Sequence, residues 1–296
     1  DSLLRLTQND TKNKTGDHVQ SLFTNKALNF IEASQQSPYF LYLAYTTPHF
    51  ELTLPAEHKV KYDSLGWPMR RMKRGHYYHD TNGHVTYASM ISKMDDDIGR
   101  IIELLKQRGE LENTVIIFTS DNGHEYDELT NEFFNSNGPF RGRKRDLYEG
   151  GIRVPFIVHW PAMVAHGSST EHITAFWDIM PTLADITDAP MEAATDGISF
   201  YPTLSGLGKQ KRHDYLYWEF NEGEGPIQAV VKGNWKLIHW VENNNYELYN
   251  LRKDPGETEE VSKNNPGVLV DLIKIVSAAR TESDEFPLTR RPNPWK

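Results

Sequence analysis

The chain has 296 residues, of which 38% are hydrophobic and 25% are charged, and its formal net charge is −9. Such a chain can bury a substantial core, whereas its acidic balance argues against a nucleic-acid-binding protein. No stretch approaches the roughly 20 consecutive apolar residues that a membrane span needs. Cysteine is absent, which excludes disulfides, thiolate metal sites and a cysteine nucleophile within these residues.

The first half of the sequence predicts helices and buried strands in alternation. Residues 1–18 predict a loop, and Asp17 can cap a helix that runs to about residue 33. Residues 38–45 form a continuous apolar and aromatic run, typical of a strand buried on both faces. Apolar residues then recur at three- and four-residue steps over 85–108, which predicts a helix that stops at Gly109.

Two further apolar runs, at 114–119 and 154–159, also have the length and composition of buried strands. Strands without polar alternation, separated by helices, are typical of parallel sheets covered on both faces. We therefore predict an α/β fold with a mostly parallel sheet flanked by helices. This domain is expected to comprise residues 1–207.

The composition changes after residue 207. Residues 208–214 are polar and predict a linker, and short alternating runs follow it. The runs lie at 215–219, 228–231, 235–240 and 246–251, and a last helix is expected at 268–279. Residues 208–296 therefore predict a small C-terminal subdomain in which an antiparallel sheet packs with one helix.

Polar residues follow two of the predicted strands. His49 comes after the first strand, and Asp121 and Asn122 come directly after the second. Ligands gather at the carboxyl ends of strands in open α/β sheets, and the oxygens of Asp and Asn suit calcium or magnesium better than zinc. The alternative is structural, because Asp-Asn-Gly is also a turn sequence and a lone histidine after proline is often a surface or packing residue.

Residues 137–155 combine positive charges with glycines just before a predicted strand. Glycines allow close backbone approach, and Lys144 would meet an anionic oxygen as a point charge. This pattern predicts an anion pocket, although a solvated basic loop with glycine turns would have the same composition.

Four segments in this order resemble the sulfatase family of the alkaline phosphatase superfamily. They are Tyr-Thr-Thr-Pro-His at 45–49, Phe-Thr-Ser-Asp-Asn-Gly at 118–123, the glycine-rich basic segment at 141–155, and residues 177–183 followed by 196–199. The tail, at 235–238 and 246–255, is similar to the small C-terminal subdomain of that family. The resemblance covers the chain from about residue 20 and matches the second half of the family. It implies an incomplete alkaline phosphatase-like fold.

The resemblance also implies roles for particular residues. Asp121 and Asn122 match two oxygen ligands of a calcium ion, and Lys144 matches the lysine that holds the sulfate group. His49 matches the histidine that contacts the sulfate and helps to protonate the departing oxygen. His124 and Arg143 are expected to contact the sugar of the substrate.

The chain departs from the family in its first half. The family nucleophile is a formylglycine made from Cys or Ser in a Cys/Ser-x-Pro-x-Arg motif, and no segment here matches that motif. The two aspartates that complete the calcium site are also missing. We therefore expect part of a longer sulfatase, inactive alone, whose partner is the N-terminal half of the same protein.

The leading functional prediction is a sulfatase that acts on sulfated carbohydrate in the periplasm or outside the cell. One alternative is a phosphodiesterase or phosphonate hydrolase of the same superfamily, which usually holds two transition metals. Asn is a poor ligand for zinc, so the pair Asp121 and Asn122 favours a single calcium. Another alternative is a binding or structural fragment without catalysis.

Overall fold

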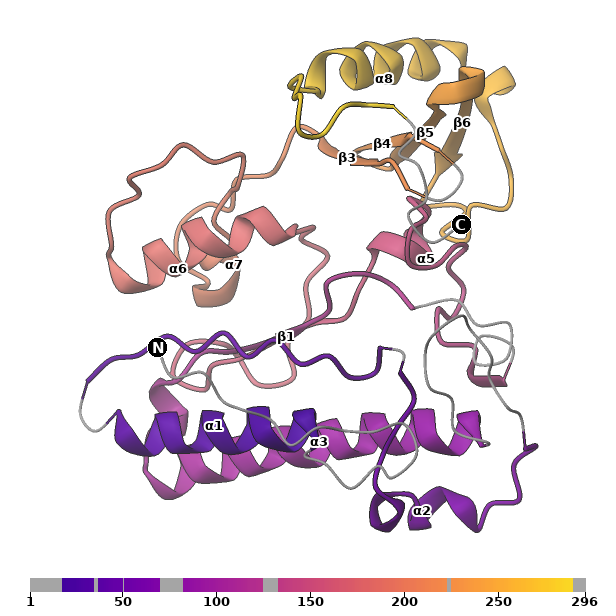
Figure 1. The fold of residues 1–296 in the computed structure, drawn as a ribbon. Coiled ribbons are helices and arrows are strands. Elements are labelled where there is room, and N and C mark those ends of the chain that lie inside the picture. Colours follow the sequence, from indigo (N-terminus) through magenta and orange to yellow (C-terminus); the bar gives the residue numbers. More distant parts are fainter. Residues whose placement is uncertain are drawn as a thin grey trace. The chain divides into compact units, whose positions relative to one another are not determined.

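The computed structural model describes residues 18–34, 37–49, 51–69, 82–124, 133–222 and 225–289 (Figure 1). The predicted loop 1–18 lies outside these ranges except for its last residue. The chain divides into two compact units, which are Asp1–Thr114 with Asp127–Asn135, and Val115–Tyr126 with Ser136–Lys296. The boundary predicted at residue 207 remains a prediction.

Helices dominate the first unit. The long helices α1 (Val19–Ala33) and α3 (Gly83–Gln107) lie side by side, and the short helix α2 (Val60–Asp63) also packs on α3 (Figure 1). The Asn82 side chain caps α3 by accepting a hydrogen bond from the Val85 nitrogen, a common way to satisfy the first amides of a helix. Both long helices confirm the predictions made from the spacing of apolar residues in the sequence.

Residues 38–45 do not form the predicted strand. They have no ladder partner among the described residues, and Phe40 (70%) and Tyr42 (75%) are exposed. A strand exists only through hydrogen bonds to a neighbouring strand. An apolar run predicts burial but supplies no partner, which is why the sequence-based prediction is wrong for the described part of the chain.

The two strands that flank the glycine-rich segment pair with each other. β1 (Ile116–Thr119) runs antiparallel to β2 (Phe156–His159), with Ile116 opposite His159. The sequence predicted parallel neighbours, so the direction of this pair is a correction. Parallel strands need a crossover that is usually a helix. Helix α5 (Glu149–Ile152), in the described part of this connection, spans four residues, too few for such a crossover.

The C-terminal sheet is antiparallel throughout and its strands follow each other in chain order. The strands are β3 (Leu216–Phe220), β4 (Ile227–Lys232), β5 (Trp235–Trp240) and β6 (Asn245–Asn250). Helix α8 (Pro266–Ala279) covers one face (Figure 1). The buried core between helix and sheet comprises Val230, Leu237, Leu248, Leu272 and Val276. The predicted small antiparallel sheet with one helix is confirmed.

Asp178 organises the segment between the two sheets of the second unit. It lies just before α6 (Ile179–Thr187) and is fully buried. Its carboxylate accepts hydrogen bonds from the backbone nitrogens of Ala175 and Ile198, each at 2.8 Å, and lies 2.8 Å from Nε2 of His213. The motif segments at 177–183 and 196–199 are therefore joined by a buried carboxylate, which makes their role structural.

The next helix is α7 (Tyr201–Ser205).

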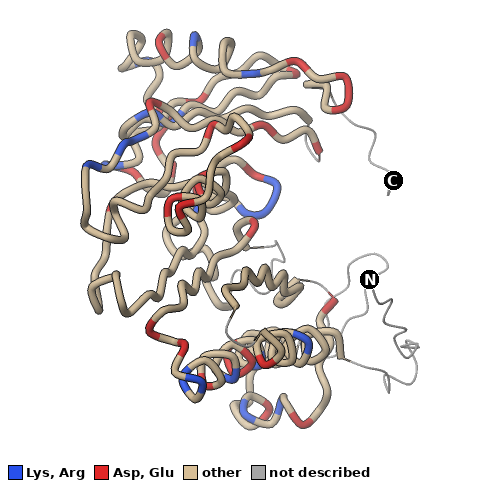
Figure 2. The backbone as a smooth tube through the Cα atoms, turned by 90° about the vertical axis from the view of Figure 1, so that its left-hand side faces the viewer, with Lys and Arg blue, Asp and Glu red and all other residues tan. Residues whose placement is uncertain are grey.

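Residues of both charge signs occur along α3 and α8 (Figure 2). Such mixed surfaces are ordinary for globular proteins. Within the part of the chain that the structure describes, no helix combines the length and the apolar character needed to cross a membrane.

Leu237 tests the core of the C-terminal sheet. Leu237→Ala should lower the free energy of unfolding by about 2–5 kcal/mol, because the side chain is fully buried against α8 and its removal leaves a cavity. Denaturant unfolding followed by circular dichroism measures the loss. The matched control Val270→Ala, on a side chain that is 50% exposed, should change stability by less than about 0.5 kcal/mol. Equal effects would contradict this description of the core.

Candidate active site

The metal-ligand candidates lie in the turn that follows β1. Oγ of Ser120 donates to the Asn122 carbonyl oxygen at 3.0 Å, which closes the turn. Nδ2 of Asn122 donates to Oδ1 of Asp121 at 2.7 Å, so the two side chains lie against each other. Because the turn follows directly after β1, the side chains of Asp121 and Asn122 both lie at the end of that strand.

The basic residues lie in a loop of residues 141–149, here called the basic loop. The backbone nitrogen of Lys144 donates to the His124 carbonyl oxygen at 2.8 Å. The nitrogen of Asp146 donates to the carbonyl oxygen of Arg143 at 2.8 Å, so the chain turns tightly around Lys144. Lys144 and His124 are therefore neighbours although 20 positions separate them in the sequence.

Three glycines make this close approach possible. The nitrogen of Gly123 donates to the carbonyl oxygen of Gly151 at 2.8 Å. A Cβ on Gly123 would lie 1.8 Å from the Gly150 carbonyl oxygen, and one on Gly151 would lie 2.1 Å from that of Asp146. No side chain fits at such distances, so the turn and the basic loop are held together backbone against backbone.

Five of the six predicted site residues thus come from two segments that contact each other. Asp121, Asn122 and His124 belong to the turn, and Arg143 and Lys144 belong to the basic loop. The Asp121 side chain is exposed, and the other four are partly buried. The turn and the loop can therefore offer carboxylate, amide and cationic groups to one ligand.

His49 belongs to the first unit. It lies in an exposed turn, where its backbone nitrogen donates to the Thr46 carbonyl oxygen at 2.8 Å. Its convergence with Asp121, Asn122 and Lys144 remains a prediction.

The residues present fit part of a calcium site. Within the described residues, Oδ2 of Asp121 and Oδ1 of Asn122 accept no hydrogen bond, which leaves two hard oxygens for a cation. The same residues contain no group of three or more His, Asp or Glu side chains placed to hold a metal. Calcium takes about 6–8 oxygen ligands. The turn therefore supplies a share of the coordination and not all of it.

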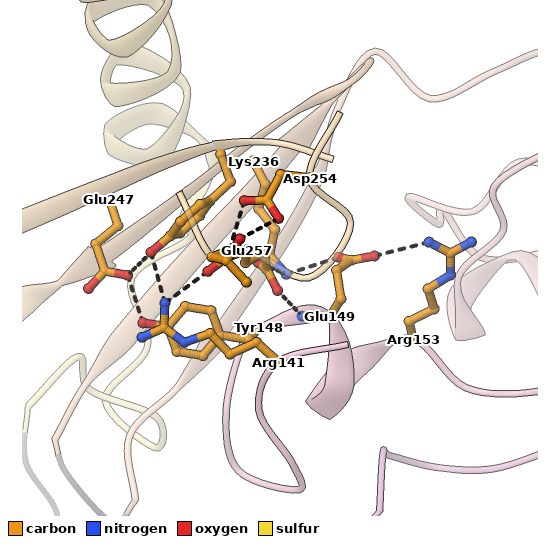
Figure 3. Close-up of polar contacts among 10 residues, drawn as sticks. Arg141, Tyr148, Glu149, Arg153, Lys236, Glu247, Asp254 and Glu257 are labelled. Atoms are coloured by element: carbon orange, nitrogen blue, oxygen red, sulfur yellow. Dashed lines mark hydrogen bonds and ion pairs between the residues drawn. The ribbon is translucent and has the colours of Figure 1, made fainter. Parts of the chain in front are cut away.

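Arg141 is a structural cation of the basic loop. Its guanidinium lies 3.9 Å from the centre of the Tyr148 ring, and Nη1 donates to the Tyr249 hydroxyl at 3.1 Å and to the Glu257 carbonyl oxygen at 3.0 Å (Figure 3). Arg141 thus makes structural contacts, and Arg143, Lys144 and Arg145 are the remaining candidates of the loop for the predicted anion pocket.

A carboxylate of the C-terminal sheet organises the aromatic residues behind the loop. Oε2 of Glu247 accepts hydrogen bonds from the hydroxyls of Tyr148 at 2.6 Å and Tyr249 at 2.8 Å (Figure 3). Burial, followed by the hydrogen bond to Glu247, raises the pKa of Tyr148, so this hydroxyl stays a neutral donor. The leucine beside Tyr148, Leu147, is buried against the same face of the sheet.

A buried group of charges also lies behind the basic loop, and sequence reasoning missed it. Lys236, fully buried on β5, lies 2.9 Å from Oε1 of Glu149 and 2.9 Å from Oε1 of Glu257 (Figure 3). Burial raises the pKa of Glu257, and the ammonium of Lys236 opposes that shift. One signal was available, because Lys236 occupies an inward position in a strand of otherwise apolar neighbours.

Comparison with known proteins defines the class of this chain. A family model described as Sulfatase matches residues 4–189, and one described as N-sulphoglucosamine sulphohydrolase, C-terminal, matches residues 140–276. The chain belongs to the sulfatase family.

Among individual relatives, the mouse N-acetylgalactosamine-6-sulfatase is 29% identical over 287 residues, which are 93% of this chain and 50% of the relative. The crystal structure of Ps i-CgsB, also solved with k-i-k-neocarrahexaose, is 26% identical with a TM-score of 0.74, and covers 90% of this chain and 55% of that one. A phosphonate monoester hydrolase of Agrobacterium radiobacter shares the fold, with a TM-score of 0.65 at 18% identity over 93% of this chain and 65% of that chain. The chain spans about half the length of the curated relatives it matches.

Gly123 tests the contact between the turn and the basic loop. Gly123→Ala should destabilise the second unit by more than about 2 kcal/mol, because the new methyl group would overlap the Gly150 carbonyl. Thermal unfolding and hydrogen exchange of residues 120–124 measure the effect. The control Gly267→Ala has open space around the new methyl group in α8 and should be tolerated. A Gly123→Ala protein with unchanged stability and exchange would contradict the contact.

Proposed function

We propose that this chain supplies the charge-stabilising half of a sulfuric ester hydrolase that acts on sulfated carbohydrate. The observation that carries the proposal is the backbone contact that places Lys144 beside the turn of Asp121 and Asn122. The names of the relatives support the substrate class, since one acts on N-acetylgalactosamine 6-sulfate and another was solved with a neocarrahexaose.

The residues of the site suit the charges that sulfate-ester cleavage creates. Cleavage places negative charge on the sulfuryl oxygens and on the bridging oxygen. The ammonium of Lys144 would stabilise the sulfuryl charge, and His49 would donate a proton to the departing oxygen. His124 and Arg143 would contact the sugar, because His124 follows the turn of Asp121 and Asn122 and Arg143 directly precedes Lys144.

Calcium is the proposed metal. Asp121 and Asn122 would hold it through the two oxygens that accept no hydrogen bond from described residues. A bound calcium ion would act as a Lewis acid on a sulfuryl oxygen. The donor set favours a single calcium over two transition metals, because an amide oxygen is a poor ligand for zinc.

The remaining part of the site is assigned to an N-terminal half of the same protein. It would carry a formylglycine nucleophile and the other calcium ligands. Support comes from the relatives, which are about twice as long as the matched region. The run 38–45, which has no partner strand among the described residues and exposes Phe40 and Tyr42, is also suited to receive a strand of that half. We place the assembled enzyme in the periplasm or outside the cell.

Two other functions are weaker. A phosphonate hydrolase shares the fold at 18% identity. The two transition metals expected for that alternative would be poorly matched by an Asp–Asn pair. A fragment that only binds would keep the turn and loop but would need no nucleophile elsewhere. An upstream Cys- or Ser-x-Pro-x-Arg motif in the parent reading frame would support the enzyme, and its absence would support the binding fragment.

Calcium titration of this chain alone tests the shared metal site. Isothermal titration calorimetry should give no tight binding, because the two oxygens of Asp121 and Asn122 are far fewer than the roughly 6–8 that calcium prefers. Asp121→Asn should remove whatever weak binding is measured. Tight stoichiometric binding by the wild-type chain would contradict the division of the site between two halves.

Lys144 tests the catalytic assignment in the complete enzyme. Lys144→Ala should lower kcat/KM for a sulfated sugar by about 10²–10³, the loss typical of removing one group that stabilises developing charge. Lys232→Ala, on an exposed lysine of β4, is the control and should retain activity. Retained turnover in the Lys144 variant, with an unchanged melting temperature, would remove Lys144 from the site.

A further inference from the structure

The basic loop is anchored where it ends. Glu149 is buried, and its Oε1 accepts a hydrogen bond from Nζ of Lys236 at 2.9 Å. Its backbone nitrogen donates to Oε2 of Glu257 at 2.6 Å, and Lys236 lies 2.9 Å from Oε1 of Glu257 (Figure 3). We call these three residues the buried ion cluster. It ties the loop to β5 and to a turn that follows β6.

The same turn contacts the start of the loop. Residues 254–259, here called the anchoring turn, are closed by Asp254, whose Oδ2 accepts from the backbone nitrogens of Thr258 and Glu259 at 2.7 and 2.8 Å. The carbonyl oxygen of Glu257 accepts from Nη1 of Arg141 at 3.0 Å. A Cβ on Gly256 would lie 2.8 Å from the carbonyl oxygen of residue 139, so the backbones touch there. Both ends of the basic loop therefore meet one turn.

Glu257 is an unusual residue for a connecting turn. Its φ of 53° lies in the left-handed region, which residues with a Cβ seldom adopt, and its side chain is fully buried. A turn that only reverses the chain would have an exposed residue or a glycine at such a position. Its backbone oxygen, Oε1 and Oε2 reach Arg141, Lys236 and the Glu149 nitrogen respectively. The strained conformation therefore serves contacts to both ends of the basic loop.

A short backbone path leads from the cluster to Lys144. Glu149 directly precedes Gly150, whose nitrogen donates to the Arg141 carbonyl oxygen at 2.6 Å. The carbonyl oxygen of Gly151 accepts a hydrogen bond from the Gly123 nitrogen, and the Lys144 nitrogen donates to the carbonyl oxygen of His124, which follows Gly123. Each link is a backbone contact without a flexible side chain, so a shift of Glu149 is passed on to Lys144.

We propose that the buried ion cluster is a positioning device, by which the C-terminal sheet fixes the place of the Lys144 ammonium relative to the Asp121–Asn122 turn. The proposal rests on the proposed function for the role of Lys144. Buried ion pairs add little net stability compared with apolar packing. They do have a narrow preferred geometry, which suits a group that must be held before the substrate arrives. Glu149, Lys236 and Glu257 are thus positioning residues and not catalytic ones.

Glu149→Ala in the full chain is the test. It removes the side-chain link from Glu149 to Lys236 but leaves Lys236 paired with Glu257, so the sheet keeps a buried pair with no net charge. Hydrogen exchange by NMR should become at least about 10-fold faster at the amides of Gly123 and Lys144, because both donate within the contact that the cluster supports. The amides of β4 and β5 should keep their wild-type rates.

Two further variants complete the design. Arg153→Ala removes the exposed partner of Glu149, which lies 3.5 Å away, and should leave exchange unchanged. Glu149→Gln keeps an oxygen for Lys236 and should restore slow exchange at Lys144. If the Ala variant does not fold, the Gln variant decides, since slow exchange with the wild-type melting temperature supports the proposal and fast exchange throughout β4 and β5 overturns it.

Activity of the complete enzyme separates this proposal from the proposed function. Glu149→Ala should lower kcat/KM by about 10²-fold, the cost of a small displacement of a catalytic group, and Glu149→Gln should recover most of it. If exchange at Lys144 becomes faster in Glu149→Ala without any loss of sulfate-ester hydrolysis, the positioning role of the cluster is supported but Lys144 is not catalytic. Unchanged exchange in Glu149→Ala, with activity abolished by Lys144→Ala, would overturn the positioning role alone.

Discussion

The arrangement of the second unit depends on one contact, the approach of Gly123 to Gly150 and Gly151 at distances that admit no side chain. This contact closes the long connection between β1 and β2 at a second point, beyond the strand ladder itself. A connection of that length would otherwise be free to take many conformations, each with a similar backbone entropy. With both closures in place, the turn of Asp121 and Asn122 and the basic loop are held next to each other, and so are the groups that they carry.

A loop that is fixed at its base still needs support from behind. The C-terminal sheet gives it, because Leu147 and Tyr148 pack on the face opposite to α8 while Glu149 reaches Lys236 through the same face. Apolar contacts stabilise the packing but do not fix its geometry, whereas the buried ion pairs fix a geometry but add little net stability. The two kinds of contact are therefore complementary. Together they explain why a small sheet that carries none of the predicted catalytic groups packs against the segment that does.

Patterns of local origin were predictable from the sequence, and contacts between distant residues were not. The three- and four-residue period over α3 and the alternation of β3 to β6 depend on neighbours along the chain, and both gave the correct elements. The turn and the basic loop were also identified, because glycine, Asp and Asn have strong local preferences. An apolar run carries no information on the direction of its partner, which is why the antiparallel pairing of β1 and β2 was missed. The pairing of Glu149 with Lys236 spans 87 positions, and only the inward lysine hinted at it.

The basic loop is a place where local preference and overall structure conflict, and such places mark function. Arg143, Lys144 and Arg145 are consecutive cations, and Arg145 has a φ of 81° in the left-handed region. Like charges repel, and this backbone conformation costs about 1–3 kcal/mol for a residue with a Cβ. Anchors at both ends of the loop, at Arg141 and Glu149, hold it in that state. A loop selected for stability alone would have glycine at the position of Arg145 and fewer consecutive positive charges. The sulfate group of the proposed substrate, which carries one negative charge, would reverse the sign of the argument, because the crowded positive charge would then be favourable.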